Sequence, residues 1–325
     1  MLRTRTLRII LASLAGVAVC LGAAFAQKDK SVSNADIAVR GLTVDDFPRW
    51  KELAPNVYAY EGLHAPIQGE VINTVSLIVV TGDGILVADG QGDVAQSQAM
   101  VQTIRKLSPE PVKYMVVASD HGDHTGGNAA FRAAFPNIVF ISSPASQKAL
   151  AGDANPPTET VSDERTIKMG DTEIQILNLG RAHTGGDLMV YLPESRVLFM
   201  SEIYLRGVFP AMRSAYPSEW VRTIEKAQAL DVSIYVPGHG FIDDPVIMKS
   251  DLEASRKALA AVIAEAKRLH EAGLPCSPVV RGESTPCEAV EKAGWGTYAD
   301  WALASSQART AILKVYQELE GKLPE

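Results

Sequence analysis

The sequence predicts a layered α/β domain in which two β-sheets pack on each other and helices cover the outside. Three observations support this prediction: short β-branched runs alternate with helical patterns, the alternation restarts so that the chain has two similar halves, and the tail is helical by period. With 46% apolar and 21% charged residues, the 325-residue chain can bury a large core, which excludes intrinsic disorder. Asp and Glu total 38 against 31 Lys and Arg, which argues against a nucleic-acid partner.

Residues 1–26 are predicted to be a secretory signal peptide. Three arginines without an acid precede the apolar run 9–24, and Ala24-Phe25-Ala26 offers the small residues that signal peptidase reads. An uncleaved membrane anchor is the alternative, but the apolar run is short for a bilayer span. A lipid anchor on Cys20 is a second alternative, and the residues before it lack the small side chain that lipoprotein processing needs. We therefore expect an exported, periplasmic protein without stable membrane insertion after cleavage.

The first half of the mature chain begins with a polar, weakly patterned lead-in over residues 27–50, predicted to be flexible, and a domain then spans residues 51–250. Thr81-Gly82-Asp83-Gly84 is a turn sequence typical of a β-hairpin and lies between two β-branched runs. Asp93 is the expected N-cap of a helix whose apolar face includes Val94, Ser97, Val101, Ile104 and Leu107. The expected order is strands 75–80 and 85–89, helix 93–107, strand 114–119, helix 127–135, strand 138–142 and helix 146–151.

The second half repeats the alternation. Strands are expected at 173–179, 188–192 and 196–200, followed by a helix at 217–230 and a strand at 233–236 that ends at Pro237-Gly238-His239-Gly240. Residues 251–270 and 298–319 have apolar residues at spacings of three and four. We expect them to form a helical C-terminal extension, residues 251–325, packed on the outer face of the domain.

Two cysteines, Cys276 and Cys287, remain after signal cleavage, and both lie in turn-forming sequence between two helical patterns. An oxidising compartment lets such thiols pair, so we predict a disulfide bond, which in the chain-entropy model contributes roughly 3 kcal/mol. The alternative is two buried free thiols with a packing role.

Potential metal ligands follow several of the predicted buried strands. The loop 119–127, Ser-Asp-His-Gly-Asp-His-Thr-Gly-Gly, brings two imidazoles and two carboxylates together, and His183 and His239 follow later strands. Zinc takes imidazole nitrogen and carboxylate oxygen, and Gly-rich turns after strands let several ligands point at one ion. A polar turn with surface histidines is the alternative, but it leaves the histidines after the two other strands unexplained. The pattern therefore predicts a metal site.

These motifs resemble those of the metallo-β-lactamase superfamily. The ordered set is a His-x-Asp-His loop, a later His before Thr-Gly-Gly-Asp, an acidic residue after a Val-Leu-Phe strand, and Pro-Gly-His-Gly, over residues 57–239. The resemblance implies a four-layer αββα sandwich with metal in a groove between the sheet edges. It implies the ligands His121, Asp123, His124, His183, Glu202 and His239. The resemblance does not define one substrate class, because members of the superfamily hydrolyse many kinds of bond.

Two residues depart from the family pattern. Ser119 stands where the family has the first His of its loop, and Glu202 stands where it has a bridging Asp. The site of His121 and His183 therefore lacks a third imidazole, whereas Asp123, His124 and His239 retain three good ligands that Glu202 can complete. We expect one tightly bound zinc ion and a second that is weak or missing. A two-metal site with water at the Ser119 position stays open.

The sequence thus predicts a zinc-dependent hydrolase in which metal-activated water attacks a small ester, lactone or amide, including β-lactams. His121, Asp123 and His183 are the candidate catalytic residues, and Asp120 is either an orienting partner or faces away. Two alternatives remain: hydrolytic dehalogenation of an activated ring, and a zinc-binding protein without catalysis.

Several further residues have two interpretations each. Asp89 either supports the metal loop from behind or caps a turn; His64 is more simply a solvated loop residue than part of a flap over the groove, and His270 is surface. Tyr204, Phe209 and Trp220 either wall an apolar pocket or pack in the core. Arg206 and Arg213 either bind a substrate carboxylate or are solvated or paired with local acids.

Overall fold

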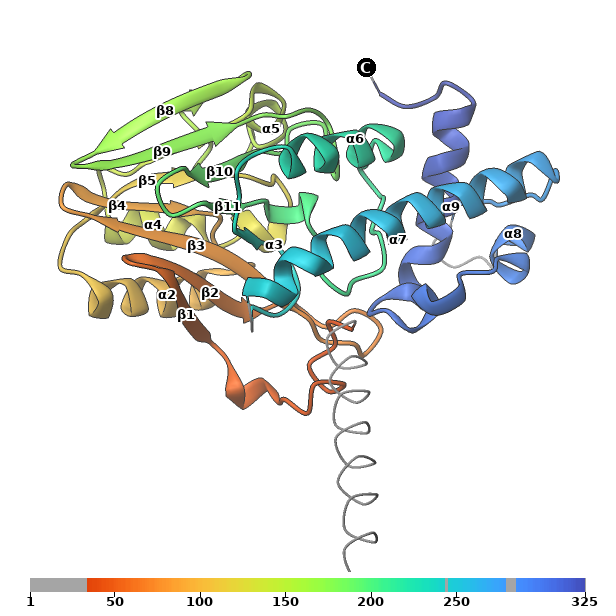
Figure 1. The fold of residues 1–325 in the computed structure, drawn as a ribbon, viewed down its shortest axis with the longest axis horizontal. Helices are drawn as coiled ribbons and strands as arrows, with labels where there is room; N and C mark the ends of the chain where they lie inside the picture. Colours follow the sequence, from red (N-terminus) through yellow and green to blue (C-terminus); the bar gives the residue numbers. More distant parts are fainter. Residues whose placement is uncertain (1–33, 243–244, 279–284, 325) are drawn as a thin grey trace, which may run out of the picture.

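The computed structural model describes residues 34–242, 245–278 and 285–324, and its strands form two sheets (Figure 1). In the first sheet the strands lie in sequence order, antiparallel from β1 to β4 and parallel from β4 to β7. These strands are β1 (Arg49–Ala54), β2 (Val57–Leu63), β3 (Asn73–Thr81), β4 (Gly84–Ala88), β5 (Val112–Val116), β6 (Val139–Ser142) and β7 (Glu159–Thr160).

The second sheet has the order β12-β11-β10-β9-β8, in which only β11 and β12 pair in parallel. Its strands are β8 (Glu164–Met169), β9 (Thr172–Leu177), β10 (Met189–Leu192), β11 (Val197–Phe199) and β12 (Ile234–Val236). Strand β8 lies where no strand was predicted. This edge strand buries only Ile167 and Met169 of its six residues, so its apolar alternation is too short to stand out.

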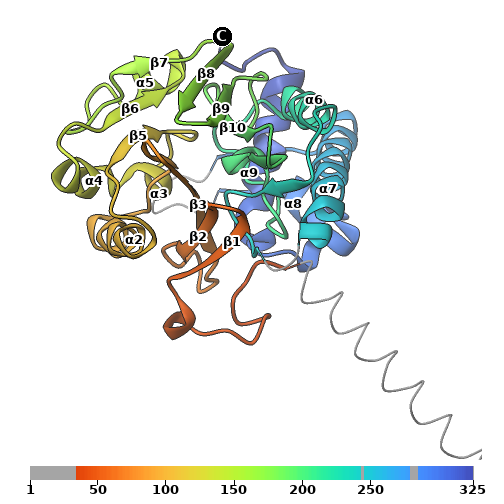
Figure 2. The same ribbon diagram turned by 60° about the vertical axis from the view of Figure 1, so that its left-hand side comes forward.

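Helices cover the outer faces of both sheets, as Figure 2 shows, with α2 and α4 on one side and α6, α7 and α9 on the other. The helices near the first sheet are α2 (Val94–Leu107), α3 (Gly122–Thr125), α4 (Asn128–Ala134) and α5 (Pro144–Ala149). The later ones are α6 (Pro217–Gln228), α7 (Pro245–Glu271), α8 (Glu288–Lys292) and α9 (Ala304–Leu319). Short 3-10 helices are η1 (Val44–Asp46), η2 (Ser201–Ile203) and η3 (Gly296–Asp300). The predicted αββα sandwich with a helical C-terminal extension is confirmed.

The alternation of side chains along the strands separates three hydrophobic clusters. In β4, Ile85 and Val87 face α2 and α4, whereas Leu86 and Ala88 face the second sheet. In β10, Met189 packs in the cluster that includes α6 and α7, and Val190 packs between the sheets. The apolar runs in the sequence are therefore strands that are buried on both faces.

Helix α2 begins as predicted, because the Asp93 carboxylate accepts a hydrogen bond from the Gln96 amide at 2.8 Å. The predicted buried face is correct for Ser97, Val101 and Ile104 but wrong for Val94, which is 44% exposed. Met100 completes the buried face instead. The helix therefore packs on the sheet from Ser97 onward.

The predicted signal peptide and Cys20 lie outside the described residues, as does the start of the lead-in. Within the described part of that lead-in, Ala35 and Ile37 are buried. The Ala35 amide donates to the Gly207 carbonyl and the Ile37 amide to the Val71 carbonyl, each at 3.0 Å. Residues near position 35 are therefore held against the loops that border the site described below.

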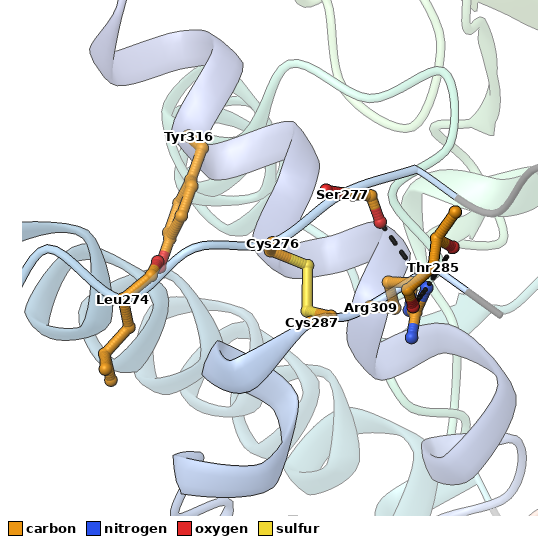
Figure 3. The surroundings of a disulfide bond; sticks show 7 residues. All are labelled: Leu274, Cys276, Ser277, Thr285, Cys287, Arg309 and Tyr316. Carbon is orange, nitrogen blue, oxygen red and sulfur yellow. Dashed lines mark hydrogen bonds between the residues drawn. A yellow bond between two sulfur atoms is a disulfide. The ribbon is translucent and has the colours of Figure 1, made fainter.

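The predicted disulfide bond between Cys276 and Cys287 is formed (Figure 3). Side chains of α9 bind the backbone on either side of it: Arg309 donates to the Thr285 carbonyl at 3.0 Å, and the Tyr316 hydroxyl donates to the Leu274 carbonyl at 3.0 Å. The disulfide and these contacts tie the connection between α7 and α8 to α9. Across the described ranges, none of the helices has both the length and the apolarity that crossing a bilayer requires.

Candidate metal centre

All the predicted ligands follow strands that end at one edge of the sandwich. Strands β4 and β5 are parallel, and β9, β11 and β12 run in one direction because β10 lies antiparallel between β9 and β11. Their carboxyl ends therefore share an edge in each sheet. The two edges are joined where Thr74 forms a bridge with His239, and where the Val75 amide donates to the Gly238 carbonyl at 2.8 Å. Topology thus brings side chains that are distant in sequence to one place.

Four side chains form the larger potential ligand set: Asp123, His124, Glu202 and His239, each offering one ligand atom within 4.8 Å of the others. The Asp123 Oδ2 atom lies 3.4 Å from His124 Nε2 and 3.1 Å from His239 Nε2. The two Nε2 atoms are 3.4 Å apart, and Glu202 Oε1 lies 3.4 Å from His239 Nε2. Two imidazole nitrogens thus point at one another beside two carboxylates.

These spacings fit a tetrahedral zinc ion. Zinc bonds to imidazole nitrogen and carboxylate oxygen are about 2.0–2.2 Å long, so neighbouring ligand atoms in a tetrahedral site lie roughly 3.3 Å apart. Four of the six separations in the set run from 3.1 to 3.4 Å, and the other two are within 4.8 Å. The residues present therefore suit the ion that the sequence pattern predicts.

A smaller set, His121, His183 and Glu202, lies beside the first. Glu202 Oε2 is 2.8 Å from His121 Nδ1 and 3.2 Å from His183 Nδ1, and the two imidazole rings are in edge contact at 4.8 Å. The Ser119 hydroxyl donates to the same Glu202 oxygen at 2.5 Å. Ser119 therefore binds the carboxylate, and the two oxygens of Glu202 serve the two sets.

The backbone around Glu202 and His239 explains the Pro-Gly-His-Gly sequence. Glu202 lies in η2, and the Gly238 amide donates to the Ser201 carbonyl at 2.7 Å. A Cβ atom at Gly238 would lie 2.5 Å from the Ser201 carbonyl carbon, so only glycine allows this approach. The His239 backbone can thus pass close to η2, which brings both side chains to the same site.

Asp89 lies behind the metal loop and is fully buried. Its Oδ1 accepts hydrogen bonds from the Ala118 and Ser119 amides at 2.7 and 3.3 Å, and its Oδ2 accepts from the Ser201 hydroxyl at 2.5 Å. The same Oδ2 lies 2.9 Å from His124 Nδ1, which leaves Nε2 of that ring directed at the ligand set. The structure therefore favours the supporting role of Asp89 over a turn cap.

The acids of the site favour protonated imidazoles before any ion binds. Burial opposes a charge on His124, but Asp123 and Asp89 outweigh burial and raise the pKa of this imidazole to about 9. At His239, burial also lowers the pKa of the imidazole, but Asp123 and Glu202 have the larger effect and raise it to about 10. Despite burial, His183 and His121 hold the pKa of Glu202 well below its usual value. A metal ion must therefore displace protons from the imidazoles.

A pocket of about 330 Å³ opens directly onto both ligand sets. Its floor includes His121, Asp123, His183, Glu202 and His239. The apolar residues of the lining, called the apolar wall below, are Ile67, Ile72, Leu205, Val208, Ala211 and Leu303. The uncharged polar residues, called the polar wall, are Ser306, Gln307 and Thr310, and His64 and Arg213 line the pocket as well. A cavity of this size and mixed character suits a small organic molecule.

The structure corrects the interpretation of His64 as a solvated loop residue. His64 lines the pocket, its Nε2 lies 3.6 Å from Asp123 Oδ2, and its ring is in edge contact with His239 at 5.7 Å.

Asp120 is half-buried, and burial raises the pKa of its carboxyl group. His270 lies partly exposed on α7, 3.3 Å from Glu320 Oε1, as expected of a surface residue.

The candidate aromatic wall is core. Tyr204, Phe209 and Trp220 are buried, and the Trp220 indole donates to the Ile203 carbonyl at 2.8 Å while its ring contacts His183. Arg206 is also buried, 2.6 Å from Asp251 Oδ2, so it pairs with α7 rather than with a ligand. Arg213 is exposed and lines the pocket.

Sequence reasoning missed the polar wall, which comes from the C-terminal extension. Ser306, Gln307 and Thr310 belong to no motif. The available signal was the helical face that they share, beside the apolar face of the same helix, but such a polar face is normally solvated.

Comparison with known proteins finds a matching family model, curated relatives and solved structures of similar fold. Residues 69–239, slightly more than half of the chain, match the family model described as "Metallo-beta-lactamase superfamily". The metallo-beta-lactamase type 2 of Bacillus sp. (strain 170) is 22% identical over 209 residues, covering 62% of this chain and 80% of that protein. The linear primary-alkylsulfatase of Pseudomonas sp. (strain ATCC 19151) is 23% identical over 266 residues, covering 65% of this chain and 48% of that protein. The structure of a metallo-beta-lactamase from Pontibacter korlensis superposes with a TM-score of 0.59 at 21% identity, covering 66% of this chain and 99% of that one.

Proposed function

Because the chain belongs to the metallo-β-lactamase superfamily, we propose that it is a zinc-dependent hydrolase that uses metal-activated water to cleave a small organic ester, lactone or amide. The observation that carries the proposal is the convergence of ligand atoms of Asp123, His124, Glu202 and His239 within 4.8 Å of one another, beside a pocket that Asp123, Glu202 and His239 line. A purely structural ion would need no cavity of about 330 Å³ beside it.

The ligand sets favour one tightly bound ion. Asp123, His124, His239 and Glu202 Oε1 would hold it, and when bound it lowers the pKa of water to about 7 and polarises a substrate oxygen. His121 and His183 have only the other oxygen of Glu202 as a third partner, and Ser119 binds that oxygen. A second ion there would be weakly held.

Without a second ion, His121 and His183 can move protons at the floor of the pocket. The Nδ1 atom of His121 faces Glu202 at 2.8 Å, while its Nε2 lies on the other side of the ring, 3.4 Å from the Ser214 hydroxyl. Although burial opposes it, the hydrogen bond that His121 donates to the Glu202 carboxylate raises the pKa of His121, which suits a group that gives a proton to a leaving oxygen or nitrogen. Asp123 faces both the ligand set and the pocket and can orient the attacking water.

The proposal includes export to the periplasm. The Cys276–Cys287 disulfide supports it, because such bonds persist in oxidising compartments. The mass of the protein recovered from a periplasmic fraction tests it: cleavage after Ala26 is the expected result, and an intact Met1 would contradict it.

The hydrolase proposal is tested by zinc content and by turnover of a lactone, lactam, carboxylic-ester and sulfate-ester panel, before and after chelation and after zinc is restored. We expect one zinc per chain and turnover that chelation abolishes and zinc restores. His239→Asn should lose zinc and at least a hundredfold in kcat/KM, on the order of what a missing ligand removes.

The matched control is His270→Asn, which removes an imidazole from α7 outside the pocket and should keep both zinc and turnover. Thermal unfolding of both variants shows whether each is folded. Bound zinc without turnover of any substrate would favour a zinc-binding protein, and folded protein that takes up no zinc would refute the proposal.

A further inference from the structure

Helix α9 packs against the hydrophobic core with one face and lines the pocket with another. Leu303, Ser306, Gln307 and Thr310 line the pocket, and their spacings of three, four and seven place them on one face. The adjoining face packs in the hydrophobic cluster that it shares with α7, through Ala304, Ala308, Ala311, Ile312 and Val315. A polar face on a solvated helix needs no explanation, but this one is directed into the candidate active site.

Backbone hydrogen bonds tie the start of α9 to the loops that border the pocket. Ala302 pairs with the segment that follows Glu202: its amide donates to the Gly207 carbonyl at 3.2 Å, and its carbonyl accepts from the Phe209 amide at 2.9 Å. The Leu303 amide donates to the Glu70 carboxylate at 2.8 Å, and Glu70 lies in the connection that carries His64 and Ile67. The position of α9 relative to the ligand sets is therefore fixed.

Leu303 has a φ of 65° and is 2% exposed. This left-handed conformation is unfavourable for a residue with a branched side chain, and such conformations gather at binding sites, where surrounding contacts enforce them. At Leu303 the enforcing contacts are those of Glu70 and of the neighbouring Ala302. The turn into α9 sets which residues of the helix face the pocket.

The polar groups of this face differ in whether they already have a hydrogen-bond partner within the protein. The Ser306 hydroxyl already donates to the Leu303 carbonyl at 3.0 Å. Among the described residues, the Gln307 carboxamide and the Thr310 hydroxyl have no hydrogen-bond partner, and both line the pocket. Together they offer donors and acceptors without charge, which suits a neutral polar group rather than an ion. The family match ends at residue 239, so this wall lies outside it.

We propose that α9 selects the substrate: Gln307 and Thr310 hydrogen-bond a neutral amide or hydroxyl group in the acyl part of the molecule, while the apolar wall holds its hydrocarbon. This inference rests on the proposed hydrolase function and names its substrate class. A site built to hydrogen-bond a substrate group discriminates strongly against the analogue that lacks it, because its own polar groups then stay unpaired.

The test uses two esters with one leaving group and equal chain length, p-nitrophenyl N-acetylglycinate and p-nitrophenyl pentanoate, with the zinc-loaded protein. Each kcat/KM is divided by the rate constant of that ester with hydroxide, which removes the difference in intrinsic reactivity. We expect the wild type to prefer the amide-bearing ester by at least about tenfold, a ratio that one or two hydrogen bonds supply.

Gln307→Leu and Thr310→Val should each lower that preference severalfold to about tenfold, because each removes a hydrogen bond that only the amide-bearing ester can make. The matched control is Gln317→Leu, which makes the same substitution on the same helix outside the pocket and should change neither ester. The role of α9 would be overturned if the wild type did not prefer the amide-bearing ester, or if the variants kept that preference. Turnover of either ester would still support the hydrolase function.

A binding measurement separates failure of the inference from failure of the hydrolase proposal. The affinities of N-acetylglycine hydroxamate and pentanohydroxamate for the zinc-loaded protein are compared by calorimetry, with the same variants. If neither ester is hydrolysed, tighter binding of the acetylglycine compound that Gln307→Leu abolishes still supports α9 as the selecting wall. Equal affinities for the two hydroxamates would overturn it.

Discussion

Glu202 is the residue on which both ligand sets depend. Its Oε1 faces His239 at 3.4 Å, and its Oε2 faces His121 at 2.8 Å. An aspartate in this position would retract the carboxylate by one methylene, roughly 1.5 Å, so that it could not keep both contacts from the same backbone position. The glutamate is therefore adapted to this backbone rather than being a neutral replacement for aspartate.

Glu202→Asp tests this adaptation. We expect zinc affinity, measured by competition with a chromophoric chelator, to fall on the order of tenfold or more, since both carboxylate contacts lengthen. Glu271→Asp makes the same change at the exposed end of α7, where Glu271 contacts only Lys267 in the described structure, and should leave affinity unchanged. Equal zinc affinities for wild type and Glu202→Asp would show that the longer side chain is not needed.

Zinc binding is also expected to release protons. At pH 7 the imidazoles of His124 and His239, with pKa values of about 9 and 10, carry protons before the ion binds. The ion binds only the neutral imidazole, so binding expels close to two protons at pH 7. Apparent affinity should therefore rise with pH, by up to about a hundredfold per pH unit between pH 7 and pH 9, because each proton contributes a factor of ten.

Calorimetry of zinc binding at pH 7, in two buffers with different ionisation enthalpies, measures this release. Binding enthalpies that do not depend on the buffer would mean that the imidazoles are already neutral. His270→Asn should release the same number of protons as the wild type, because His270 lies outside both ligand sets.

The residues of the centre were predictable because the motifs carry them, whereas the environment of His64 and Arg206 was not. Ligands such as Asp123 and His124 follow a buried strand directly, so local sequence fixes their position. The direction of His64 depends on its contacts with Asp123 and His239, and the burial of Arg206 depends on Asp251 of α7. Both are contacts between segments far apart in sequence, which periodicity and spacing do not encode.

At the scale of elements, the same limit separates β8 from β4. Strand β4 could be predicted from the sequence because both of its faces are apolar. In β8, buried and exposed residues alternate and only two residues are buried, so the pattern is too short to recognise. The C-terminal helices were predictable as helices from their apolar faces, but the use of the polar face of α9 was not, because the pocket exists only after α9 packs beside the loop that follows Glu202.

The disulfide is expected to stabilise the extension to which α9 belongs. The double variant Cys276→Ser, Cys287→Ser should lower the free energy of unfolding by about 3 kcal/mol, because the unfolded chain regains the freedom that the cross-link removed. Urea unfolding measures the change. Reduction of the wild type should give a similar loss, and an unchanged midpoint in both experiments would mean that the contacts of Arg309 and Tyr316 suffice.

At the scale of the whole molecule, the candidate metal centre takes its residues from both sheets. Asp123 and His124 follow a strand of the first sheet, whereas Glu202 and His239 follow strands of the second. An ion held by all four would be a cross-link between the two halves of the sandwich, in addition to the hydrogen bond from Val75 to Gly238.

Removal of the metal should therefore lower the stability of the whole domain. With free zinc at a hundred times its dissociation constant, binding stabilises the folded state by about 2.7 kcal/mol, so chelation should lower the melting temperature by about 5–10 °C. Calorimetric scans with and without chelator check this, and His239→Asn should show no further loss on chelation. An unchanged melting temperature in the wild type would mean that no ion bridges the sheets.

The shared edge also dictates when the centre can form during folding. Neither half of the chain contains a complete ligand set, because the acid and imidazoles after β5 meet Glu202 and His239 only once the sheets have docked. A nascent or partly folded chain therefore presents fragments of the site that bind ions poorly. Metal binding is therefore expected to be one of the last events of folding. The ion stabilises the fold after the sheets have docked and does not nucleate it.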